Sequence, residues 1–111
     1  MAEVATGTLA RDVKLFGRRV TSFADTLEGL AEEAEGLRRG AAEAVRRLGW
    51  WSAAVDEGFA RHDLLRAFLA LSGVVEGLDR VPRSHGAAVE ASALAQEGAD
   101  LCATLYDLVA E

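Results

Sequence analysis

The chain has 111 residues, of which 50% are hydrophobic, and its 18 acidic and 12 basic residues give a net charge of −6 at pH 7. A length of this order is typical of one domain, so residues 1–111 are expected to fold as a single unit. The negative charge repels phosphate backbones, which argues against nucleic acid as a partner.

The first predicted helix covers residues 8–48. Its apolar residues recur at alternating spacings of four and three, a heptad pattern that is typical of a long helix packed along one apolar stripe. The motif SFAD at residues 22–25 matches a capping box, which leaves a break between Gly17 and Ser22 open. The stripe consists of Leu9, Val13, Phe16, Val20, Phe23, Leu27, Leu30, Ala34, Leu37, Ala41, Ala44 and Leu48.

Two further helices are predicted over residues 52–81 and 85–110. Gly49 separates the first two helices, although the heptad phase can also be carried past it as one continuous helix. Pro82 ends the second helix because it lacks an amide hydrogen and its ring clashes with the preceding turn. Ser84 is then the expected N-cap of the last helix. The second stripe consists of Leu64, Phe68, Leu71, Val75 and Leu78, widened by Leu65 and Leu69.

These elements predict an all-α fold. It is an antiparallel hairpin of long amphipathic helices with a third, C-terminal helix, similar to a three-helix bundle, that associates through its heptad stripes. Small residues let helix backbones approach closely. If the chain folds back directly after Gly49, Gly29 of the first helix lies near Gly73 of the second.

The sequence contains no recognisable catalytic, cofactor-binding or metal-binding motif. Neither His62 nor His85 follows a glutamate by three residues, as di-iron bundles require. Cys102 is the only cysteine, so it cannot form an internal disulfide, and both histidines lie in other segments of the chain. We therefore expect a protein that is not an enzyme and that binds neither a cofactor nor a metal.

The N-terminal residues lack the basic start and apolar core of a cleavable signal peptide. The longest apolar run, residues 67–75, is too short to span a bilayer. These two features predict a cytoplasmic protein without a membrane span.

Both tryptophans of the chain, Trp50 and Trp51, directly follow Gly49, and Phe59 lies eight residues after Trp51. This pattern between two amphipathic helices resembles the WxG-motif small proteins of type VII secretion, in which a Trp-x-Gly turn joins two antiparallel helices. The resemblance covers roughly residues 8–81. It implies a small helical protein that is exported without a cleavable signal peptide, or a partner of such a protein.

The sequence departs from that family at two points. Ala53 stands where the turn glycine follows Trp51, or Ser52 if Trp50 is aligned instead. The C-terminal export signal of the family is a tyrosine with an acidic residue four positions later, whereas Tyr106 is followed at that distance by Ala110. The turn glycine and the export signal of the family are therefore not matched in this sequence.

The two tryptophans are expected to play different roles. Trp51 continues the heptad phase of Leu48, so Trp51 and Phe59 are predicted to anchor the turn in the core. Adjacent helical residues point about 100° apart, so Trp50 is predicted to face a protein partner.

The first predicted helix is longer than either of its predicted neighbours. Part of its apolar stripe would therefore remain uncovered in a monomer, and we predict partner contacts at Phe16, Val20 and Phe23. The expected function is a non-catalytic helical interaction module that forms a homodimer or pairs with another helical protein. The alternative is a cytoplasmic adaptor, a chaperone-like protein or a small subunit of a larger bacterial assembly.

Overall fold

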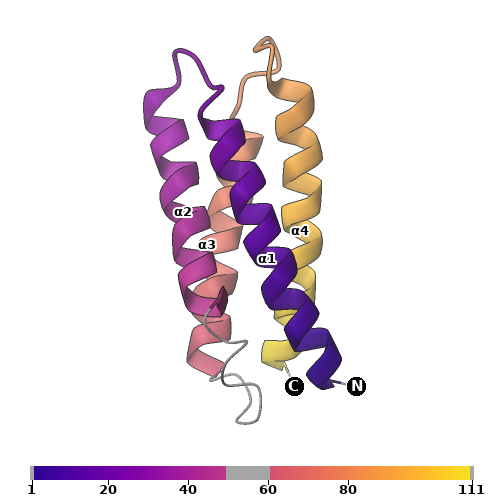
Figure 1. Ribbon diagram of the computed structural model, residues 1–111. Coiled ribbons are helices and arrows are strands. Elements are labelled where there is room, and N and C mark those ends of the chain that lie inside the picture. Colours follow the sequence, from indigo (N-terminus) through magenta and orange to yellow (C-terminus); the bar gives the residue numbers. More distant parts are fainter. Residues whose placement is uncertain (1, 50–60, 111) are drawn as a thin grey trace.

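The computed structural model describes the backbone of residues 2–49 and 61–110 and the side chains of residues 9–48 and 64–110. In these ranges it contains no strand and four helices: α1 (Ala2–Ala24), α2 (Ala31–Gly49), α3 (Arg61–Asp79) and α4 (Ala88–Ala110). They run alternately up and down in an elongated bundle of 46 × 20 × 19 Å (Figure 1). The all-α prediction is confirmed.

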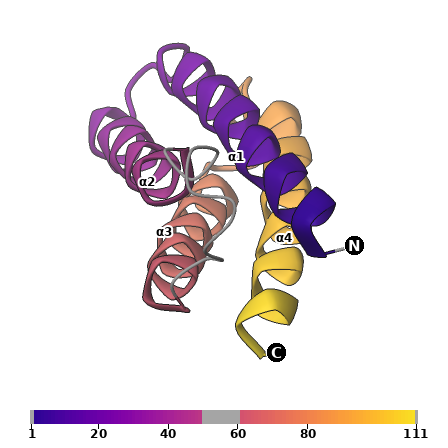
Figure 2. The same ribbon diagram turned by 60° about the horizontal axis from the view of Figure 1, so that its bottom comes forward.

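The helices follow one another around the bundle axis, as Figure 2 shows. Each helix packs extensively against its neighbour in sequence. Helix α1 also packs against α4, but this interface is much smaller than the other three. This up-and-down order is one of the two common topologies of four-helix bundles.

The long helix predicted over residues 8–48 is wrong, because the chain forms two helices separated by residues 25–30. Gly29 has a φ of 77°, a left-handed conformation that glycine adopts without steric cost and that cannot continue a helix. Thr26 closes the end of α1, since its amide and its hydroxyl donate to the Phe23 carbonyl at 2.9 and 2.7 Å. The alternative break between Gly17 and Ser22 is also wrong, because both residues lie within α1.

The boundaries of the other two predicted helices also differ from the structure. The predicted start at residue 52 lies outside the described residues, and α3 is described from Arg61 to Asp79. The last helix begins at Ala88 instead of residue 85. The predicted N-cap at Ser84 is therefore wrong: Ala87 directly precedes the helix, and its carbonyl accepts the Ala91 amide at 2.9 Å. His85 holds the turn before the helix, because its Nδ1 accepts the Ala87 amide at 3.1 Å and its carbonyl accepts the Ala88 amide at 3.0 Å.

His85 also connects two loops at one end of the bundle. With Nδ1 acting as an acceptor, the ring proton is on Nε2, which donates to the carbonyl of Glu28 at 3.2 Å. The loop between α3 and α4 is thereby tied to the loop between α1 and α2.

The core is built from the predicted stripes. Among the side chains described, no polar or charged residue is buried, so removal of apolar surface from water is the main stabilising term. Phe16, Val20 and Phe23 of α1 are at most 1% exposed. The largest other side chains that are fully buried are Leu37, Leu48, Leu71, Leu78, Leu105, Val13 and Val74.

Glycines allow the closest approach between helices. A Cβ on Gly40 of α2 would lie 2.7 Å from Cγ2 of Val74 on α3, and a Cβ on Gly77 would lie 3.0 Å from Cδ2 of Leu37. The predicted approach of Gly29 to Gly73 is wrong: Gly29 lies in the turn after α1, and its neighbour Glu28 contacts His85 in the loop after α3, whereas Gly73 lies within α3.

Candidate functional site

The residues predicted to bind a partner are not on the described surface. Phe16, Val20 and Phe23 lie in the core, because the turn at residues 25–30 folds α2 back over α1 and covers the stripe that was expected to overhang. The reason for assigning a partner to these three residues therefore disappears. Trp50, Trp51 and Phe59, predicted as partner contact and turn anchors, lie outside the described residues.

The described surface instead exposes other large apolar side chains. Leu65 and Leu69 of α3 are 43% and 56% exposed and lie one helical turn apart. They were predicted to widen the core stripe of the second helix, and this prediction is wrong because none of the four described helices covers that side of α3. The other exposed large apolar residues of the described part are Leu15, Val89 and Tyr106.

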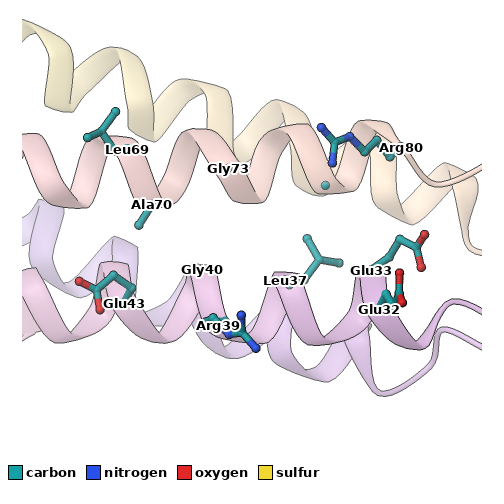
Figure 3. A pocket seen from close by; sticks show the side chains of 12 residues that line it. Glu32, Glu33, Leu37, Arg39, Gly40, Glu43, Leu69, Ala70, Gly73 and Arg80 are labelled. Carbon is teal, nitrogen blue, oxygen red and sulfur yellow. The ribbon is translucent and has the colours of Figure 1, made fainter.

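Leu69 borders a surface groove between α2 and α3, which we call the α2–α3 groove (Figure 3). The groove has a volume of about 610 Å³. Leu69 and Ala70 of α3 line one end together with Glu43 of α2. Arg80 of α3 and Glu33 of α2 line the other end.

The middle of this groove is lined by glycines that the fold itself does not need. A Cβ on Gly36 or on Gly73 would meet no neighbouring heavy atom within 4 Å. Both residues lie within helices, where glycine is less stable than alanine by about 0.5–1 kcal/mol. Because neither residue has a side chain, the helix backbone at these two positions is accessible to another molecule.

The charged side chains of the groove carry both signs. Glu32, Glu33 and Glu43 are acidic, and Arg39 and Arg80 are basic. The mixture distinguishes this groove from a surface that attracts only anions or only cations.

Glu43 is the carboxylate with the best-defined contacts in this groove. Arg47 donates from Nε to Oε1 of Glu43 at 2.9 Å, and this hydrogen bond lowers the pKa of Glu43. Desolvation opposes the shift, and the charges of Arg46, Arg47 and Arg66 add to it. Glu43 is therefore ionised at neutral pH and presents a fixed negative charge at the Leu69 end of the groove.

Cys102 of α4 is partly buried, with its Sγ 3.8 Å from the Ser72 hydroxyl of α3. Burial raises the pKa of this thiol, and the contact with Ser72 opposes the shift without reversing it. Since the thiolate is the reactive form of cysteine, this environment disfavours nucleophilic chemistry at Cys102.

In the described part of the chain, no group of three or more His, Cys, Asp or Glu side chains has an arrangement that could hold a metal ion. None of the described helices has both the length and the apolar character that a bilayer-spanning segment needs.

The α2–α3 groove, with one exposed leucine, open glycines and charges of both signs, is therefore the candidate functional site. No protein family, curated protein or solved structure matches this chain.

Proposed function

We propose that the protein is a non-catalytic helical interaction module that pairs with a second copy of itself through the α2–α3 groove. The observation that carries this proposal is the position of Leu69, an apolar side chain that is more than half exposed beside a groove lined by open glycines. Burying such a leucine against a second chain removes apolar surface from water.

The mixed charges of the groove support a second copy as the partner. In a two-fold symmetric contact the same patch faces itself, so the patch must be self-complementary. Glu43 lies at one end of the groove and Arg80 at the other (Figure 3). An antiparallel pairing therefore brings Arg80 of each copy to the end of the groove at which Glu43 of its mate lies.

The same pairing also accounts for the open glycines, Gly36 and Gly73. With the two-fold axis near Gly73, Leu69 of one copy lies over the other end of its mate's groove, at the level where Leu37 faces Gly77. Gly36 is the open position next to Leu37. Backbones without a Cβ at Gly36 and Gly73 then let the two surfaces approach closely.

Sedimentation velocity over a wide concentration range tests this proposal. The wild type is expected to be a dimer, and Leu69→Glu is expected to be a monomer of unchanged helicity by circular dichroism. Loss of an apolar contact of about 2 kcal/mol weakens association roughly thirtyfold.

Leu15→Glu is the matched control. Leu15 is a comparably exposed leucine, at 45%, but it lies on α1 outside the α2–α3 groove. This variant should remain a dimer. A folded wild-type monomer at high micromolar concentration, or equal dissociation by both variants, contradicts the proposal.

A further inference from the structure

A second groove, which we call the α1–α2 groove, lies between the first two helices and has a volume of about 670 Å³. Its floor consists of small apolar residues: Gly17 and Ala41 are buried, Val45 is half-buried and Ala42 is exposed. A Cβ on Gly17 would lie 2.7 Å from Cγ2 of Val45. The two helices therefore meet closely at the floor, and no large side chain fills the space above it.

Every ionisable side chain that lines this groove is a cation. Lys14 and Arg18 lie one helical turn apart on α1, and Arg46 lies on α2. The cations therefore come from both helices that flank the apolar floor. The charge of this groove is therefore opposite in sign to the net charge of the chain, which is −6.

These cations are poorly compensated. No ion pair involves Lys14 or Arg18 within the described residues. Arg46 lies 3.3 Å from Glu43, but the Arg46 side chain is 72% exposed, and exposed pairs of this kind contribute about 0–1 kcal/mol. The positive potential of the groove is therefore available to an anionic ligand.

We propose that the α1–α2 groove binds an acidic amphipathic helix of a different protein. A helix fits a shallow groove between two helices by placing its apolar side chains on the floor. Its flanking carboxylates then meet Lys14 and Arg18 on one side and Arg46 on the other. The apolar floor requires an apolar face in the ligand, and the cations require acidic residues beside that face.

A second copy of the chain does not fit this groove by symmetric pairing, because cations would face cations. Nucleic acid is disfavoured because the net charge of the chain repels it. The proposal is independent of the α2–α3 groove, since the two grooves share no lining residue.

The test uses a fluorescent helical peptide of about 18 residues, or five turns, with leucine and alanine on one face and glutamate on both flanks. Fluorescence anisotropy is measured with full-length protein, and a control peptide carries lysine in place of every glutamate. The acidic peptide is expected to bind and the basic peptide is not. Added salt should weaken binding, since exposed charges are screened.

Two charge-reversed variants locate the site. Lys14→Glu combined with Arg18→Glu should weaken binding of the acidic peptide by at least about tenfold. Arg11→Glu combined with Arg83→Glu changes the net charge equally at exposed positions outside both grooves, and its affinity should stay within about twofold of the wild type. Circular dichroism checks that each variant retains its helicity.

Several outcomes overturn the proposal. They are absence of acidic-peptide binding at millimolar concentration, equal binding of both peptides, and equal weakening by both variants. Anionic phospholipid vesicles provide another arm: binding to vesicles without binding to the peptide assigns the groove to a membrane surface. Loss of self-association in Lys14→Glu with Arg18→Glu assigns it to a second copy instead.

Discussion

The interior of the bundle and the α2–α3 groove use the same residue types in opposite ways. In the interior, Leu71 is fully buried, and the side chains of Phe16 and Val75 pack directly against Gly98 of α4. In the groove, Leu69 is exposed and Gly73 has open space above it. A leucine or a glycine therefore serves folding or recognition according to which helix face carries it.

Replacement of Leu71 should produce the largest difference between the two regions. Leu71→Ala leaves a cavity in the core and should lower the free energy of unfolding by about 2–5 kcal/mol. Leu69→Ala removes a leucine two residues away and should change the stability of the monomer by no more than about 0.5 kcal/mol. Urea denaturation of both variants at a concentration that favours monomers measures the difference, and equal destabilisation would contradict the assignment of the two faces.

Gly98→Ala should have the next largest effect. The added methyl group would lie 2.8 Å from Cγ2 of Val75 and 2.9 Å from Cζ of Phe16. Overpacking of this kind costs about 1–3 kcal/mol, which exceeds the gain of up to about 1 kcal/mol from replacing a helical glycine. Thermal unfolding should therefore show a lower melting temperature, whereas an unchanged or higher one would mean that the α1–α4 contact is looser than described.

Gly73→Ala should change the stability less than Leu71→Ala or Gly98→Ala does, and in the opposite direction. Its methyl group meets no neighbouring heavy atom, so higher helix propensity should stabilise the monomer by about 0.5–1 kcal/mol. The Leu69→Glu background is suitable for this measurement because self-association does not contribute there. In the wild-type background the same substitution should weaken the dimer, and destabilisation in the Leu69→Glu background would show that the fold itself needs Gly73.

Much of the core was predictable because burial follows heptad spacing. Val13, Leu37 and Leu48 were placed on the apolar stripe from spacing alone, and all three are buried. The same periodicity concealed the turn after α1. Leu27 is buried and Leu30 is half-buried, so apolar residues keep their spacing through a segment that is not helical. Gly29 was the available signal for this turn.

The α2–α3 groove was less accessible to sequence reasoning. The spacing of Leu65 and Leu69 matches a wide apolar stripe, but spacing along one helix does not reveal which neighbouring helix covers each position. The groove also depends on the register between Leu37 and Gly77 on separate helices. The apolar positions along either helix, taken separately, do not reveal this register.

The order of the helices around the bundle has a consequence for the folding process. Every extensive helix–helix interface joins elements that are consecutive in the chain, and the interface between α1 and α4, which closes the ring, is much smaller. Bringing α1 and α4 together carries the largest loop-closure entropy, because nearly the whole chain lies between them. A topology dominated by contacts between consecutive helices has a low contact order and favours rapid folding. The cyclic arrangement is then completed by its weakest interface, where Phe16 lies against Gly98 and Arg19 pairs with Glu97.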